Sequence, residues 1–141
     1  MNSAAVGLPL FVQIKQGPGS PNPQKVTMST IEPGGQISVA PGDQAVLSLP
    51  ETWSLKEPGE STPWSASISG KNASNFKVQY LGTGAVMPAE YSSGVNLSQV
   101  MELVQKFQLT SAAPGTALLT FLAKDEAGKL FTKEEFNLVS Q

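Results

Sequence analysis

Two pairs of adjacent acidic residues are the groups in this sequence that could support acid–base chemistry or bind a cation. They are Asp125-Glu126 and Glu134-Glu135. General acid–base catalysis needs carboxylates that converge on one reacting group, and a calcium loop needs oxygen ligands at alternating positions. Adjacent side chains in a strand or tight turn point apart, and the EF-hand spacing is missing. We therefore interpret both pairs as solvated turn charges.

Cysteine and histidine are both absent from the 141 residues. The sequence therefore provides no disulfide, no thiolate or imidazole metal site, and no Cys-His or Ser-His nucleophile pair. A carboxylate dyad, a Ser-Lys pair or a carboxylate-held cation stays open in principle, but no convergent pair of acids stands out. We expect a protein that is not an enzyme and that uses no cofactor and no metal.

The composition is that of one folded domain. Apolar residues make up 40% of the chain and charged residues 14%, with a net charge of -2. The nine basic residues are all Lys and thinly spread, so nucleic acid is not an expected partner. No apolar run reaches the roughly 18 residues of a membrane span. The opening residues lack the basic start of a signal peptide, although a mature periplasmic or secreted form stays compatible with the sequence.

The segment from Leu49 to Trp64 is long for a connection in a β-sandwich and rich in Pro, Ser and Glu. Long loops on a rigid scaffold often carry function, and exposed Trp is a common interface anchor. Trp53 is the better candidate for such an anchor. Trp64 has a second interpretation, as the buried core tryptophan at the start of its strand.

Two further connections are candidates for binding a protein. The segment Gly82–Asn96 offers Met87 and Tyr91, which adapt well at interfaces. It could equally be an ordinary connection with these side chains folded back on the core. The segment Lys124–Lys129 separates two strand-like runs and is interpreted as a hairpin tip.

Short strands between turn signals are the elements that would present these connections. Pro-Gly, which favours a type II turn, begins at Pro18, Pro33, Pro41, Pro58 and Pro114. Strand-like runs cover residues 10–15, 25–30, 36–39, 44–49, 64–68, 76–81, 107–110, 117–123 and 130–139. This organisation predicts an all-β, immunoglobulin-like antiparallel sandwich.

One turn-and-strand segment occurs twice. SVAPGDQAVLSL begins at Ser38, and SAAPGTALLTFL begins at Ser111. A sandwich can turn a strand through Pro-Gly and continue it as the next strand at more than one place. We favour two independent uses of a good turn over gene duplication.

Two regions fit the strand pattern less directly. In NLSQVMELVQKF, Val100, Leu103, Val104 and Phe107 have helical spacing, and we expect a loop or short helix that becomes a strand by about Lys106. The alternative is a strand that places Met101, Leu103, Phe107 and Leu109 on one face, with Gln105 as the polar exception. Residues 1–33 are expected to form an N-terminal β extension of the sandwich core at 34–141, within one domain. Its GPGSPNPQ segment is interpreted as a stiff, exposed connector between two strands.

The chain resembles the chagasin-like inhibitors of papain-type cysteine peptidases. GDQAVLSLP, beginning at Gly42, is similar to that family's turn and strand, and EPGESTPW can be aligned with its signature loop through Pro58 and Trp64. FQLTSAAPGTALLTFLAKD is similar to the strand, turn and strand that lead to the family's last loop. The resemblance implies an immunoglobulin-like sandwich in which three loops at one end block a peptidase cleft.

We therefore expect a non-catalytic protein-binding domain whose partner is a papain-type cysteine peptidase. The alternative is a structural or adhesive module of an exported or surface assembly, with contacts through sheet faces or edges. The expected partner-binding residues are Trp53, Pro58, Gly59, Glu60, Ser61, Thr62, Trp64, Tyr91, Ser93, Gly94, Lys124, Asp125 and Glu126.

Overall fold

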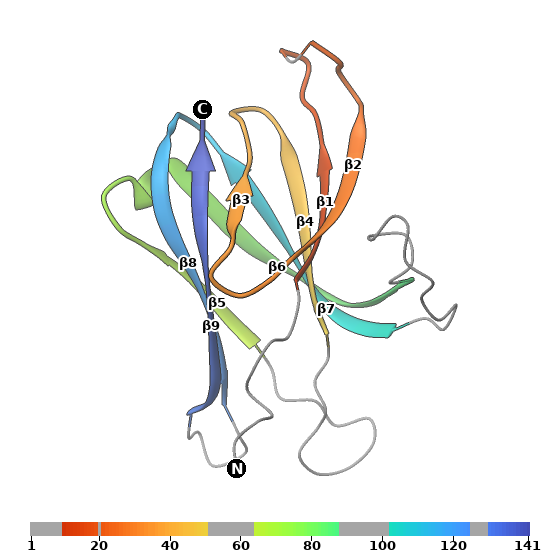
Figure 1. Ribbon diagram of the computed structural model, residues 1–141, viewed down its shortest axis with the longest axis vertical. Coiled ribbons are helices and arrows are strands. Elements are labelled where there is room, and N and C mark those ends of the chain that lie inside the picture. Colours follow the sequence, from red (N-terminus) through yellow and green to blue (C-terminus); the bar gives the residue numbers. More distant parts are fainter. Residues whose placement is uncertain (1–9, 20, 51–63, 88–101, 125–129) are drawn as a thin grey trace.

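The computed structural model describes residues 10–19, 21–50, 64–87, 102–124 and 130–141, which form a sandwich of two β-sheets (Figure 1). The strands are β1 (Leu10–Lys15), β2 (Val26–Ile31), β3 (Gln36–Ser38), β4 (Gln44–Pro50), β5 (Trp64–Ser69), β6 (Phe76–Val86), β7 (Glu102–Ser111), β8 (Gly115–Lys124) and β9 (Leu130–Ser140). One sheet has the order β2-β1-β4-β7-β6, and the other has the order β3-β9-β8-β5. The predicted all-β, immunoglobulin-like sandwich is confirmed.

Pairing within the sheets is antiparallel except at one edge, where β3 runs parallel to β9. Apolar side chains at alternate positions of each strand face the opposite sheet, because successive side chains of a strand point to opposite faces. The buried core contains Leu10, Val12, Ile37, Val39, Ala45, Leu47, Leu49, Trp64, Phe76, Phe107, Leu109, Leu119, Phe121, Ala123, Phe136 and Leu138.

The repeated segment forms two of the connections at which the chain changes sheets. Pro41-Gly42 takes the chain from β3 in the second sheet to β4 in the first, and Pro114-Gly115 takes it from β7 in the first sheet to β8 in the second. The corners are neighbours, because Gly42 donates its backbone N–H to the carbonyl of Ser111 at 3.4 Å. Similar residues therefore serve two crossings of the same core in opposite directions.

Two of the predicted Pro-Gly turns have the hydrogen bond and backbone angle of a type II turn. Asp43 donates its N–H to the Ala40 carbonyl at 3.0 Å, and Gly42 has φ +92°. Gly35 donates to the Glu32 carbonyl at 2.8 Å, and Gly34 has φ +88°. A positive φ at the third residue is what glycine supplies without a steric cost.

The region expected as an extension supplies both an inner strand and an edge strand. β1 lies between β2 and β4, and its Leu10 and Val12 belong to the core. β2 pairs with β1 as an antiparallel hairpin and forms the edge of the sheet. The GPGSPNPQ segment joins these two strands, as expected, and its described residues other than Gly17 are exposed or partly exposed.

The helical interpretation of residues around Leu103 and Val104 is wrong, because β7 already begins at Glu102. Leu103 is 58% exposed, whereas Val104 is buried on the outer face of the sheet together with Phe11 and Val86. Leu103 and Val104 thus lie on opposite faces of β7. Apolar residues on both faces of a strand can match the i, i+3, i+4 spacing of a helix over a few residues. Gln105, the polar exception on the inner face, accepts a hydrogen bond from the hydroxyl of Tyr80.

Candidate functional site

Three connections leave the sandwich at the same end. Pro50, where β4 ends, pairs with Val104, two residues from the start of β7. Trp64, where β5 begins, pairs with Ala123, one residue from the end of β8. The strand ends that flank residues 51–63 therefore lie beside strand ends that flank residues 88–101 and 125–129. This end lies opposite the Pro41-Gly42 and Pro114-Gly115 corners (Figure 1).

Trp64 is a core residue. Its side chain is 6% exposed, and its ring meets Phe121 edge to face with centroids 6.4 Å apart. Phe121 in turn packs against Phe107 from the other sheet, with centroids 5.1 Å apart. The interpretation of Trp64 as the buried tryptophan of the sandwich fits this position, and its side chain does not present a surface anchor.

The other expected contact residues fall mainly outside the described part of the chain. Those are Trp53, Pro58, Gly59, Glu60, Ser61, Thr62, Tyr91, Ser93, Gly94, Asp125 and Glu126. Lys124 is the last residue of β8, where it pairs with Leu130 at the start of β9. The antiparallel pairing of β8 with β9 makes the segment between them the connection of a hairpin, as expected.

Glu134 is a buried acid that the sequence interpretation placed in solvent. It is 2% exposed and lies opposite Phe121 in the β8–β9 ladder. The expectation of a solvated turn charge is wrong for this residue, because β9 carries it two residues before Phe136 on the inward-facing register. Glu135, on the other face, is partly exposed and lies 3.6 Å from the amine of Lys133. Strand periodicity from Phe136 and Leu138 was the signal that could have located the buried position.

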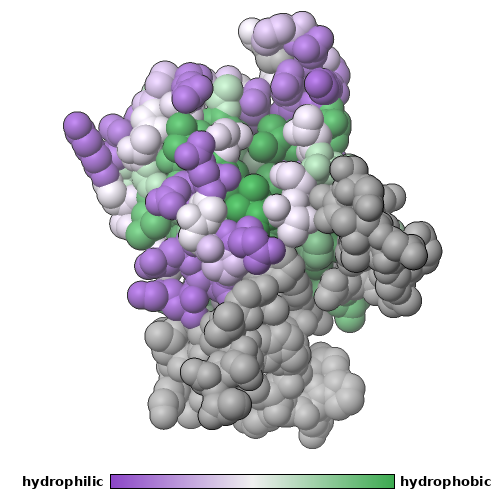
Figure 2. Space-filling model, viewed as in Figure 1, coloured by the Kyte–Doolittle hydropathy of each residue, from purple (hydrophilic) through white to green (hydrophobic). Residues whose placement is uncertain are grey.

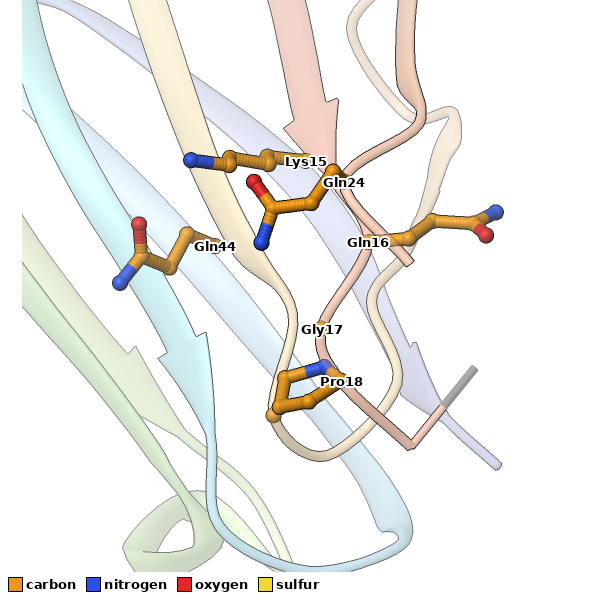
Figure 3. A pocket seen from close by; sticks show the side chains of 7 residues that line it. Lys15, Gln16, Gly17, Pro18, Gln24 and Gln44 are labelled. Atoms are coloured by element: carbon orange, nitrogen blue, oxygen red, sulfur yellow. The ribbon is translucent and has the colours of Figure 1, made fainter. Parts of the chain in front are cut away.

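A small polar pocket lies at the opposite end, between the β1–β2 loop and the Pro41-Gly42 corner (Figure 3). Its volume is about 120 Å³, and its lining residues are Lys15, Gln16, Gly17, Pro18, Gln24, Gly42 and Gln44. The Lys15 amine and the amides of Gln24 and Gln44 lie on one side and could hydrogen-bond a small polar group, whereas the Gln16 amide points away from them (Figure 3). The lining contains no carboxylate, so the pocket has no general base of that kind.

Asp43 is a buried residue beside this pocket that hydrogen-bonds to two loops. Its Oδ1 accepts the backbone N–H of Gly17 at 2.9 Å, and its Oδ2 accepts that of Ala40 at 3.3 Å. Asp43 is buried, and each of its carboxylate oxygens accepts a backbone hydrogen bond. Asp43 therefore holds the start of the β1–β2 loop against the Pro41-Gly42 corner. Across the described residues, no group of three or more Asp or Glu side chains comes together in a way that could hold a metal ion.

The β2 edge is an exposed element that the expected contact residues did not include. Val26 and Met28 are 44% and 37% exposed, and no charged residue, proline or glycine lies within Val26–Ile31. Figure 2 shows a hydrophilic tip on this hairpin, with hydrophobic residues reaching the surface below it. An alternating run next to a Pro-rich connector could have suggested an edge strand, but the sequence does not specify its neighbour.

A scan of protein-family models, a search of curated proteins and a search of solved structures found no match to this chain. Within the described ranges, no helix has the length and apolar character needed to cross a membrane.

Proposed function

We propose that the chain is a non-catalytic protein-binding module that inhibits papain-type cysteine peptidases. The connections 51–63, 88–101 and 125–129 would enter the active-site cleft together. The observation that carries this proposal is the pairing of Pro50 with Val104 and of Trp64 with Ala123, which brings the ends of all three connections to one end of the sandwich.

The scaffold beneath these connections supports such a role. A blocking loop must keep its shape against a peptidase, and preorganisation lowers the conformational entropy lost on binding. Trp64, Phe121 and Phe107 form a chain of ring contacts across the core near the strand ends. The cleft would be occluded without chemistry by this protein, which agrees with a chain that contains neither cysteine nor histidine.

Titration of papain activity with the purified protein tests the proposal. One variant replaces residues 53–62 with a Gly/Ser linker of equal length and keeps Trp64, because that residue belongs to the core. The control replaces residues 19–23, in the loop at the opposite end, in the same way. We expect inhibition by the parent and the control but not by the first variant, with all three proteins folded. A lack of inhibition by the parent at about 10 µM, well above the nanomolar constants of tight inhibitors, would contradict the proposal.

A second candidate function is a structural or adhesive module that makes its contacts through a sheet edge. The exposed, uncharged strand β2 favours this function, because natural sheets usually protect such edges with charges, proline or bulges. An inhibitor that acts only through its loops does not need this edge. Concentration-dependent self-association or strand addition by a partner would distinguish the second function from the first.

A further inference from the structure

The polar pocket beside the Pro41-Gly42 corner brings together hydrogen-bond donors from three segments of the chain. Lys15 and Gln44 are direct partners in the β1–β4 ladder, so their side chains leave the sheet on the same face. Gln24 comes from the end of the β1–β2 loop, and its amide lies on the same side of the pocket (Figure 3). One amine and two amides therefore line one side of a space of about 120 Å³.

Gln24 has a backbone conformation that is unusual for its residue type. Its φ is +72°, and in the described part of the chain it is the one residue other than glycine with a positive φ. Glycine is the usual residue at the first position of such a bulge, because it has no Cβ to clash in the left-handed region. Strained residues of this kind cluster at ligand-binding sites. Glycine at this position would lack the side chain that supplies one donor of the pocket.

The sheet beside the pocket is positively charged, although the whole chain has a net charge of -2. Its five strands contain Lys15, Lys77 and Lys106 and one acidic residue, Glu102. Glu102 is the first residue of β7, at the end of the sandwich opposite the pocket. The strands of the other sheet contain two lysines and two glutamates. The potential of the first sheet therefore favours an anion over a cation at the pocket.

The charge of Lys15 is not neutralised by another side chain that the structure describes. No salt bridge among the described residues involves Lys15, and the pocket lining contains no carboxylate. Asp43 lies beside the pocket, but its two carboxylate oxygens accept the backbone N–H groups of Gly17 and Ala40. An anion in the pocket would therefore be the ion-pair partner of Lys15.

We propose that this pocket binds a carboxylate group. The Lys15 amine and the amide N–H groups of Gln24 and Gln44 would donate hydrogen bonds to its two oxygens. One lysine matches the single charge of a carboxylate better than the double charge of a phosphate. A water molecule needs roughly 10–15 Å³ of such space, so the pocket has room for a carboxylate and a short aliphatic chain.

Two sources carry this chemistry, namely the acidic side chain of a partner protein and a free short-chain carboxylic acid. Neither requires peptidase inhibition, because the pocket lies at the end of the sandwich opposite the three connections. All three donor side chains are exposed, so the ion pair is screened by solvent and we expect weak binding.

NMR titration of the isotope-labelled protein at neutral pH and constant ionic strength tests the proposal. The probes are sodium acetate, the peptide N-acetyl-Gly-Glu-Gly-amide and its Gln counterpart. Acetate and the Glu peptide should shift the side-chain amide signals of Gln24 and Gln44 with dissociation constants of about 1–30 mM, and the Gln peptide should not. A Glu peptide that binds about tenfold more tightly than acetate identifies a protein side chain as the source, and acetate that binds as tightly as the peptide identifies a free acid.

Three substitutions locate the site. Lys15→Gln removes the charge and should weaken acetate binding about fivefold or more. Gln24→Ala removes one donor to a charged group and should weaken it about threefold to tenfold. Lys77→Gln is the matched control, because it removes the same charge from the same row of the sheet, three strands and about 14 Å from Lys15. At about 0.15 M salt this distance exceeds the screening length, so the control should change the constant by less than about twofold.

The outcomes decide between a built site and general attraction. Weaker binding in Lys15→Gln and Gln24→Ala, with Lys77→Gln unchanged, supports the pocket. A lack of amide shifts up to about 100 mM acetate and Glu peptide overturns the proposal. Equal losses in Lys15→Gln and Lys77→Gln also overturn it, because binding would then follow the charge of the whole sheet. The peptidase proposal is tested separately, since papain titration reports on the opposite end of the molecule.

Discussion

The Asp43 carboxylate accepts the backbone N–H of Gly17 at 2.9 Å, which ties the start of the β1–β2 loop to the corner between β3 and β4. The two residues are 26 positions apart. The same carboxylate accepts the Ala40 N–H, and Asp43 donates its own N–H to the Ala40 carbonyl. The side chain of Asp43 thus adds a contact within the type II turn, which its backbone N–H closes, and joins this turn to the hairpin that carries β2.

Replacement of Asp43 by Ala should lower the free energy of unfolding by about 2–3 kcal/mol, because two backbone donors lose a charged acceptor. Asp43→Asn keeps one acceptor oxygen and should cost about half as much. Urea denaturation measures both changes. Glu135→Ala is the matched control, since it removes an exposed carboxylate beside Lys133 and should change stability by less than about 0.5 kcal/mol. Equal effects of Asp43→Ala and Glu135→Ala would show that the buried contacts of Asp43 contribute little.

Gly17→Ala should be destabilising by about 2 kcal/mol or more, because the new methyl group has no room. An added Cβ at Gly17 would lie 2.4 Å from the Gly42 carbonyl oxygen and 2.7 Å from its carbon. These are backbone atoms of a constrained turn, so neither can move away at low cost. Gly19→Ala is the control in the same loop, since nothing lies within 4 Å of its added Cβ. Thermal unfolding should leave Gly19→Ala close to the parent, and a similar loss in both variants would contradict the close-contact explanation.

Turn chemistry and strand alternation predicted most of the fold. The Pro33-Gly34 and Pro41-Gly42 turns form as local preferences require, and the strand-like run at residues 10–15 forms β1 (Leu10–Lys15). These features depend on a few neighbouring residues. The place of β1 between β2 and β4 depends instead on pairing with residues far away in the chain, which local patterns do not specify.

The candidate site was less predictable. From the sequence, Trp64 could be either a partner-binding residue or the core tryptophan. Its packing against Phe121 assigns it to the core. Glu134 was predicted to be a solvated charge because of its residue type. The strand register that buries Phe136 also places Glu134 on the inward face. The β2 edge was not predicted because exposure of a strand edge depends on which strand lies beside it. Residue type indicates chemistry, but sheet order decides which groups reach the surface.

Gln24→Gly should stabilise the protein by about 0.5–1 kcal/mol. Gln24 has φ +72° and, with Lys25, lies opposite Gln16 as an extra residue in the hairpin. A non-glycine residue in the left-handed region costs on the order of 1 kcal/mol, and glycine is the usual residue at the first position of such a bulge. Gln24→Ala keeps the Cβ and should be nearly neutral. A glycine variant that is no more stable than the alanine variant, in the midpoint of urea denaturation, would exclude strain at this position.

Substitutions of Trp64 separate its role in the core from a role in binding. Its Nε1–H is buried without a hydrogen-bond partner among the atoms that the structure describes. Trp64→Phe removes this unsatisfied donor and some volume, so the two effects oppose each other and the net cost should stay below about 1.5 kcal/mol. Trp64→Ala leaves a cavity beside Phe121 and should cost about 3–5 kcal/mol. Denaturation gives both values, and papain titration below the unfolding transition gives the effect on binding. Because the ring faces the core, Trp64→Phe should inhibit as well as the parent, and a loss of inhibition in this folded variant would mean that the indole itself contacts the peptidase.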